Sequence, residues 1–374
     1  MMRTPRIAMY GSLNDGYARR IARGMAMVCT GYGVRRRLVS APPAMLPRLV
    51  QEFGLAGLIA TVGDVGTAAL MRDLPVPVVN VSGRLQTDDL PTTTADNVAV
   101  GRSAGEHLVQ RSSGTYLVIG IGQARFADER EAGFREVVAQ TNGQVFSASA
   151  FPTPAALIGW LRAAPKPVGV FGVNDHVAAR FMNEAQEGGL RVPEDLRIVG
   201  ADNDDLVCQM CDPLLTSVDC CFELVGATAT RQLLDWIKTG ERPPARTLIA
   251  PSGLLVRQSS DHVTTADDLV NKAMAMIRSE AASGLTVKKL VQRLGLSRRA
   301  LELRFHRELK TTPAAEMQRV QIEAACRMLV DTDVPLSRVV EASGFSSQRQ
   351  LRSVFHRALG ASPMRFRARF RPLA

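Results

Sequence analysis

The sequence predicts an α/β domain with parallel sheets, followed by an all-α domain that carries two helix-turn-helix motifs. Three observations lead to this prediction. Short apolar runs alternate with amphipathic stretches from residue 5 to residue 258. Near the C-terminus, two similar helix-turn-helix segments follow each other about fifty residues apart. Nearly all of the excess positive charge lies in that same C-terminal part of the chain.

The apolar runs of the first part have the character of buried strands. Each is apolar on both faces and ends in Gly, Ser, Asn or Asp. The runs are RIAMYGS, GLIATVG, PVVNVSG, TYLVIGIG, VGVFGVN and LRIVGAD. Between them lie the helical stretches Tyr17–Thr30, Val98–Gln110, Glu129–Gln140 and Asp175–Glu187. This alternation predicts parallel sheets covered by helices, with a ligand crevice beyond the carboxyl ends of the strands.

The polar segment RQSSDHVTTADD separates the two parts and ends in helix-capping residues. We therefore place the domain boundary near Asp261, which gives domains at residues 1–260 and 261–374. Helices are expected at 267–282 and at Ala314–Val330, the latter between the two helix-turn-helix units. At 1.5 Å per residue this middle helix spans about 25 Å, a spacer that could set two reading helices in successive major grooves.

The helix-turn-helix segments are LTVKKLVQRLGLSRRALELRFHREL and PLSRVVEASGFSSQRQLRSVFHRAL, with tight turns at Gly295 and Gly344. The second helix of each unit opens with serine and basic or amide side chains, which can pair with guanine, adenine or phosphate. An ordinary charged surface helix is the alternative for either unit alone. The candidate DNA-binding residues are Ser297, Arg298, Arg299, Glu302, Arg304, Ser347, Gln348, Arg349 and Arg352.

Charge supports the same interpretation. From Asp261 onward there are 20 Lys and Arg against 11 Asp and Glu, whereas the preceding residues have 26 against 25. A basic C-terminal surface would attract the phosphate backbone of double-stranded DNA. No apolar run is long enough to span a bilayer or to resemble a signal peptide, and the scattered cysteines fit a reducing compartment. We expect a cytoplasmic protein that does not contact membranes.

Residues 267–371 resemble the DNA-binding domain of AraC-type transcription regulators. The matching segments are LGLSRRALELRF, a linker helix that ends in AACRML, and GF…VFHRALGASPMRFR. Two positions depart from the family pattern: Leu351 replaces a usual aromatic residue, and Thr311 replaces a usual glycine.

The first domain resembles the periplasmic-binding-protein-like sensor of LacI-type repressors. The resemblance is carried by ADEREAGFREVV, VFGVNDHVAARFMNEAQEGGLRVPEDLRIVGADNDD, DPLLTSVD and LLVRQSS. It implies two α/β lobes that close on a small ligand. The three connections between the lobes would lie near Asp96–Gly101, Asp219–Glu223 and Ala250–Gly253.

The resemblance also implies the ligand-binding residues. Arg130, Asn174 and Asp202 stand at the family's contact positions, with Asp175 and Asp96 as further candidates and Phe126 or Tyr17 as an aromatic platform for a sugar ring. Carboxylates, a guanidinium group and amides suit the many hydroxyls of a sugar. The alternatives are a structural Arg130–Asp202 salt bridge, helix capping by Asn174 or Asp175, and aromatic residues that belong to the core.

Together the two resemblances imply a sugar-responsive activator of transcription. The expected partners are a double-stranded DNA operator, RNA polymerase, a second copy of the chain in a homodimer, and a sugar effector, with D-xylose implied. The same architecture could sense another pentose, a hexose or a nucleobase.

Two other functions fit the sequence less well. An amidase-like domain would need a nucleophile elbow with a histidine partner, and no Ser or Cys lies in a G-x-[SC]-x-G pattern. The pair Cys208-x-x-Cys211 with Cys220 and Cys221 could hold a metal or sense redox state, but adjacent cysteines depart from zinc-site spacing. We therefore expect no enzyme, no cofactor and no metal.

Overall fold

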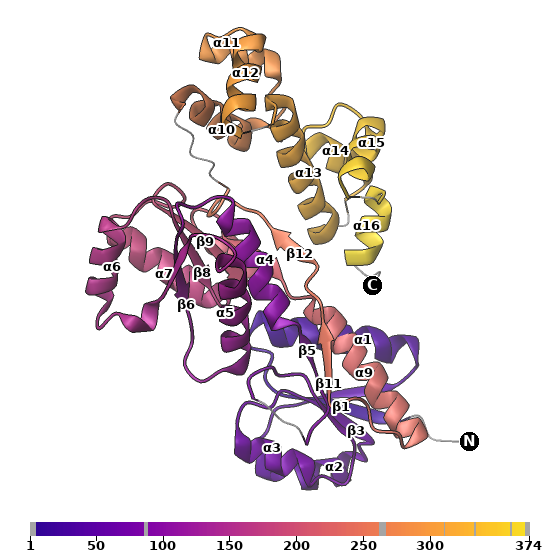
Figure 1. Cartoon of the computed structure of the whole chain (residues 1–374). Coiled ribbons are helices and arrows are strands. Elements are labelled where there is room, and N and C mark those ends of the chain that lie inside the picture. Colours follow the sequence, from indigo (N-terminus) through magenta and orange to yellow (C-terminus); the bar gives the residue numbers. More distant parts are fainter. Residues whose placement is uncertain are drawn as a thin grey trace. The chain divides into compact units, whose positions relative to one another are not determined.

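The computed structural model describes residues 5–85, 89–261, 267–309, 311–332, 334–359 and 361–370. It divides into two units, Met1–His262 and Val263–Ala374 (Figure 1). Within the described residues, no helix is both long and apolar enough to cross a membrane.

The first lobe of the N-terminal unit is built on a parallel six-stranded sheet with the order β11-β5-β4-β3-β1-β2. Its strands are β1 (Arg6–Tyr10), β2 (Arg35–Val39), β3 (Gly57–Ala60), β4 (Val78–Asn80), β5 (Thr92–Ala95) and β11 (Arg246–Ile249). Its helices are α1 (Gly16–Gly31), the 3-10 helix η1 (Pro43–Met45), α2 (Leu46–Phe53), α3 (Val65–Arg72) and α9 (Phe222–Thr239). Helices α1 and α9 pack against each other.

The second lobe has a six-stranded sheet with the order β12-β10-β9-β8-β6-β7, parallel except for the antiparallel pair β10–β12. Its strands are β6 (Thr115–Ile119), β7 (Gln144–Ser147), β8 (Val168–Gly172), β9 (Leu196–Ala201), β10 (Thr216–Asp219) and β12 (Gly253–Leu255). Its helices are α4 (Asn97–Val109), α5 (Arg125–Val138), η2 (Ala148–Ala150), α6 (Pro154–Ala163), α7 (Asp175–Glu187) and α8 (Asp205–Met210). Helices α4 and α5 pack together.

The chain passes between the two sheets from β5 to α4, from β10 to α9 and from β11 to β12. These are the three connections expected from the sequence, and the predicted α/β fold with parallel sheets is confirmed. The six predicted strands are β1, β3, β4, β6, β8 and β9, and all are fully or almost fully buried. Burial on both faces explains why each is apolar along its whole length.

Short polar side chains begin most of the helices. Each accepts a hydrogen bond from a backbone N–H of the first turn, which would otherwise lack a partner. These capping residues are Asp15, Asp64, Asp96, Thr153, Asn174, Asp204, Asp267, Thr286 and Thr312.

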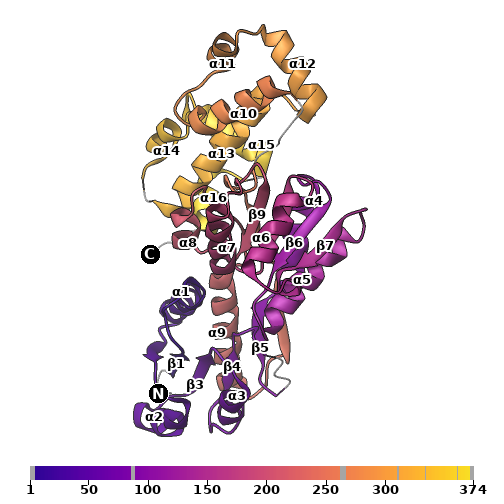
Figure 2. The same cartoon turned by 90° about the vertical axis from the view of Figure 1, so that its left-hand side faces the viewer.

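Among its described residues, the C-terminal unit forms helices and no strands, as predicted. Its helices are α10 (Asp268–Glu280), α11 (Val287–Leu294), α12 (Arg298–Leu309), α13 (Pro313–Asp331), α14 (Leu336–Ala342), α15 (Gln348–Leu359) and α16 (Pro363–Phe370). The long helix α13 packs with α10 and α12 along its first half and with α14, α15 and α16 along its second half (Figures 1 and 2). Each helix-turn-helix pair, α11–α12 and α14–α15, therefore packs into its own small core along a shared helix.

Glycine is required at the turns of both motifs because the backbone there is left-handed, with φ of +65° at Gly295 and +75° at Gly344. Gly344 is also tightly packed. A Cβ atom at this position would lie 2.3 Å from the carbonyl oxygen of Ala281, whereas a Cβ at Gly295 would meet nothing within 4 Å.

Candidate functional site

A buried ion pair joins two of the predicted ligand-binding residues in the second lobe. Arg130 lies on α5 with 2% of its surface exposed, and its Nη1 is 2.8 Å from the Asp202 Oδ1 at the end of β9. The same guanidinium group donates to Asn97 Oδ1 at 3.0 Å and to the carbonyl of Val173 at 2.6 Å. The position of the guanidinium group is thus fixed from several directions, while the Asp202 side chain keeps 19% of its surface exposed.

Asp202 has an unusual backbone conformation, with φ of +107°. Only glycine adopts this region without strain, so the surrounding contacts must hold the residue in place. The Asp202 N–H donates to the carbonyl of Val218 at 3.0 Å, and the Asp202 carbonyl accepts from Arg20 Nη1 at 2.7 Å. Burial raises the pKa of the Asp202 carboxyl, and Arg130 partly offsets this effect. Strain of this kind is frequent at ligand-binding sites.

The other polar candidates act within the second lobe as helix caps or supports. Asn174 Oδ1 accepts from Val177 N at 2.9 Å, and Asp96 Oδ1 accepts from Ala99 N at 3.0 Å. The Asn174 contact matches the capping alternative, whereas the capping role of Asp96 was not predicted.

Asp175 is buried and contacts the loop that follows β9, which contains Asp202 and Asp204. It accepts the Ser217 hydroxyl at 2.6 Å and the Asp204 N–H at 2.7 Å. Burial, with a smaller contribution from Asp202, raises the pKa of Asp175 to about 8. Asp175 therefore shapes the loop that presents Asp202.

The two aromatic candidates are half-buried and come from different lobes. Phe126, on α5, lies with its ring centroid 5.1 Å from the Arg130 guanidinium, and its N–H donates to the carbonyl of Gly83 in the first lobe at 3.1 Å. Tyr17, on α1, donates its hydroxyl to the carbonyl of Val81 and packs edge to face on Phe222 at 4.7 Å. Burial raises the pKa of the Tyr17 phenol.

Sequence reasoning did not identify Arg20, Asp219 and Glu223, which form an ion cluster beside Asp202. Arg20 Nη2 is 2.8 Å from Asp219 and 2.7 Å from Glu223. A signal was available in part, since Arg20 lies one helical turn after Tyr17 and the two carboxylates lie in a predicted connection between the lobes.

The four cysteines weighed as metal ligands are largely buried. Burial raises the pKa of the thiols of Cys208, Cys211, Cys220 and Cys221, which disfavours the thiolate form that a metal requires. Within the residues that the structure describes, no three His, Cys, Asp or Glu side chains are grouped as a metal site.

The second helix of each helix-turn-helix unit exposes most of the side chains predicted to read DNA. In α12, Ser297 caps the helix by accepting from Ala300 N at 3.1 Å, Arg299 is exposed, and Arg298 pairs with Glu302 at 2.8 Å. In α15, Ser347 accepts from Gln350 N at 3.2 Å, and the side chains of Gln348, Arg349 and Arg352 are exposed. The two helices thus present matching positions fifty residues apart.

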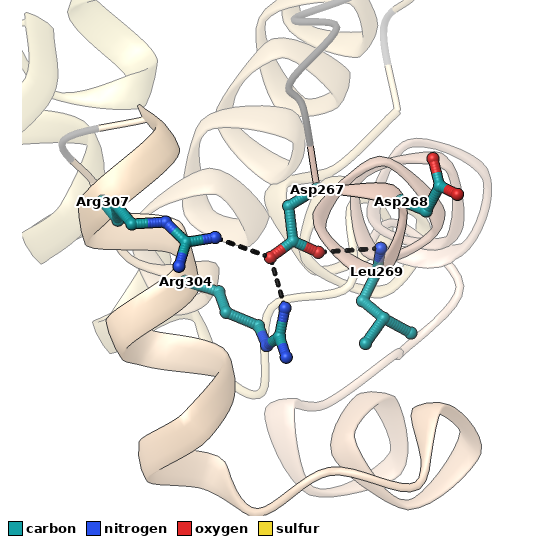
Figure 3. A pocket seen from close by; sticks show the side chains of 5 residues that line it. All are labelled: Asp267, Asp268, Leu269, Arg304 and Arg307. Atoms are coloured by element: carbon teal, nitrogen blue, oxygen red, sulfur yellow. Dashed lines mark hydrogen bonds and ion pairs between the residues drawn. The ribbon is translucent and has the colours of Figure 1, made fainter.

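Arg304 lies apart from that exposed face. Its guanidinium group pairs with Asp267, the capping residue of α10, and Arg307 pairs with the same carboxylate at 3.0 Å (Figure 3). Asp267 is buried and also accepts from the N–H of Leu269 at 3.0 Å. This cluster attaches the start of α10 to α12, so Arg304 has a structural partner that the sequence did not predict.

Comparison with known proteins agrees with this architecture. Residues 106–260 match the periplasmic binding protein-like domain family, and residues 290–369 match a helix-turn-helix domain family. The chain is 28% identical over 326 residues to the xylose operon regulatory protein of Escherichia coli (strain K12), with 83% of both chains covered. It is 26% identical to the Haemophilus influenzae protein of the same name, over 85% of this chain and 86% of the relative.

A solved structure of a xylose-binding transcription activator matches with a TM-score of 0.63 and 26% identity, over 98% of each chain. This match and the two relatives span both units. The chain is therefore a homologue of the xylose operon regulatory proteins: a transcription regulator that joins a periplasmic-binding-protein-like sensor to an AraC-type DNA-binding domain.

Proposed function

We propose that this regulator senses D-xylose in the cleft between the sensor lobes and, as a homodimer, activates transcription from a double-stranded DNA operator. The observation that carries the effector site is the buried Arg130–Asp202 pair at the carboxyl end of β9. Its position is where parallel sheets bind ligands. The names of the relatives and of the solved structure support xylose over other sugars.

The charged side chains around Asp202 favour a neutral, hydroxyl-bearing ligand. The guanidinium of Arg130 is paired with Asp202, and that of Arg20 with Asp219 and Glu223. Both cations are thus neutralised within the protein, and a phosphorylated or acidic sugar would meet carboxylates near them. A neutral sugar can instead donate hydrogen bonds from its hydroxyls to the partly exposed Asp202 carboxylate. Another neutral sugar is the alternative effector.

Binding is coupled to DNA through closure of the lobes. A sugar held by both lobes stabilises the closed state, and closure alters how two sensors pack in the dimer. The DNA-binding domains then engage two half-sites and present a surface to RNA polymerase. We propose no catalytic role, because the relatives are transcription regulators.

Calorimetric titration with pentoses, hexoses and purines tests this function. Selective binding of D-xylose is expected, with strong loss in Asp202→Asn because the substitution removes a charged acceptor. Asp205→Asn is the matched control, since Asp205 is exposed and pairs with Gln209 on its own helix. If a different sugar bound, the proposed architecture would stand and the assignment of D-xylose as effector would be wrong. No binding across the panel by folded protein would refute the sugar sensor.

A further inference from the structure

The side chain of Arg20 bridges the two sensor lobes. Arg20 lies on α1 of the first lobe, and its side chain is 15% exposed. Its Nη1 donates to the Asp202 carbonyl at 2.7 Å and its Nη2 to Asp219 Oδ1 at 2.8 Å. Both acceptors lie in the second lobe, at the ends of β9 and β10. The contact therefore joins the two lobes beside the connection from β10 to α9.

The first lobe aims this arginine at its partners. Glu223, on α9, accepts from Arg20 Nε through both carboxylate oxygens, at 2.9 and 2.7 Å. Because the guanidinium group is rigid and planar, fixing Nε also fixes the direction of both Nη groups. A neighbouring contact shows how closely the lobes approach. A Cβ atom on Gly16, the first residue of α1, would lie 2.1 Å from Asp204 Oδ2 of the second lobe.

Asp202 is consequently held from two sides. Arg130 of its own lobe binds the carboxylate at 2.8 Å, and Arg20 of the opposite lobe binds the backbone carbonyl. The positive φ of Asp202 is a conformation that needs such support. If Arg20 moved away with the first lobe, Asp202 would keep its contact with Arg130 and lose its contact with Arg20.

We propose that Arg20 is a positioning residue that fixes Asp202 in its sugar-binding geometry only when the lobes close, and so couples closure to assembly of the effector site. This inference rests on the proposed function, which assigns Asp202 to the sugar. Since the Arg20 bonds belong to the closed state alone, they also raise the fraction of closed protein before sugar binds. The apparent sugar affinity is expected to rise in proportion to the fraction of closed protein.

The test compares D-xylose affinity in the full-length chain and its variants by calorimetry. Arg20→Ala is expected to bind about 10- to 100-fold more weakly, the effect of losing charge-assisted hydrogen bonds. Arg19→Ala is the matched control, because the exposed Arg19 donates only to carbonyls of its own lobe, at Leu13 and Asn14. It is expected to bind like the wild type.

Asp219→Asn provides a second variant that keeps Arg20 and its first-lobe partner in place. It is expected to weaken binding in the same direction. The double variant should bind no more weakly than Arg20→Ala alone, because the Arg20–Asp219 contact is already absent in Arg20→Ala. The loss should appear in the dissociation rate, because the bonds hold the lobes closed around the bound sugar. A purely structural role would instead lower the urea midpoint and leave this rate unchanged.

Two outcomes would overturn the inference, and they are distinguishable. If the wild type binds D-xylose and Arg20→Ala binds within about twofold of it, the positioning role is wrong while the proposed function stands. If the wild type and Arg19→Ala bind no sugar of the panel, the proposed function fails and the inference fails with it.

Discussion

Replacing Arg130 by methionine tests the sensor site through its buried ion pair. The substitution keeps a long side chain but removes the guanidinium group. The Asp202 carboxylate then loses its partner at 2.8 Å, and the Asn97 and Val173 oxygens lose their donors. A negative charge would remain in a largely desolvated position.

The distance sets the size of the effect. Two unit charges 2.8 Å apart attract by about 6 kcal/mol at an effective dielectric constant of about 20. The cost of desolvating both charges offsets part of this attraction in the wild type. When one partner is removed, no attraction remains to offset the desolvation cost of the other charge. We expect Arg130→Met to lower the free energy of unfolding of the sensor by about 3 to 5 kcal/mol.

Urea denaturation followed by tryptophan fluorescence reports this change selectively. The chain has two tryptophans, Trp160 on α6 and Trp236 on α9, and both lie in the N-terminal unit. Arg102→Met is the control, because Arg102 makes an equally short contact with Glu136 at 2.8 Å but on the surface. It should unfold close to the wild type. If both variants unfolded alike, burial would not be what gives the Arg130 pair its strength.

Three further predictions follow from the structure. Because burial raises the pKa of Asp175 to about 8, the folded state keeps a proton between about pH 4 and pH 8 that the unfolded state has lost, so stability falls as pH rises through this range. In urea titrations, the free energy of unfolding of Asp175→Asn should therefore increase relative to the wild type as pH rises, by at most about 1.4 kcal/mol per pH unit. A difference in unfolding free energy that stayed constant with pH would contradict the raised pKa. In fluorescence anisotropy with a selected DNA site, Arg299→Ala should bind about tenfold or more weakly, whereas Arg304→Ala should change affinity by less than about threefold; the reverse order would show that Arg304 reads DNA. Gly344→Ala should melt the C-terminal helices at a clearly lower temperature than Gly295→Ala by circular dichroism, because only the former adds a backbone clash to the cost of positive φ; equal melting temperatures would refute this.

The sequence predicted three inner strands of each sheet and missed the edge strands β2, β7, β11 and β12, together with β5 and β10 beside them. Strand β2, with the sequence RRRLV, is mostly exposed, so it lacks an apolar run. Strand β5 is buried but reads TTTA, and its Thr93 hydroxyl is satisfied by Gln232 of α9. Hydrophobic patterning cannot find a strand whose polar side chains are paired through tertiary contacts.

The site was predictable where residues follow strands and unpredictable where distant segments meet. Asp202 stands directly after a buried strand, and the family resemblance supplied Arg130. Arg20 and Glu223 are separated by 203 residues, and only the packing of α1 on α9 brings them together. The sequence did not reveal the Arg304–Asp267 ion pair, because its partner lies 37 residues away; Arg304 adjoins the buried Phe305, at the edge of the core-facing side of α12.

The most direct test of the regulator measures DNA affinity and sugar together. Double-stranded sites would be selected from a random library and titrated with the protein by fluorescence anisotropy, with and without D-xylose. The structure and its relatives predict a sequence-selective site whose affinity changes about tenfold or more with D-xylose, and no such change in Asp202→Asn. Absence of sequence preference, or a DNA affinity that no sugar alters, would contradict the account.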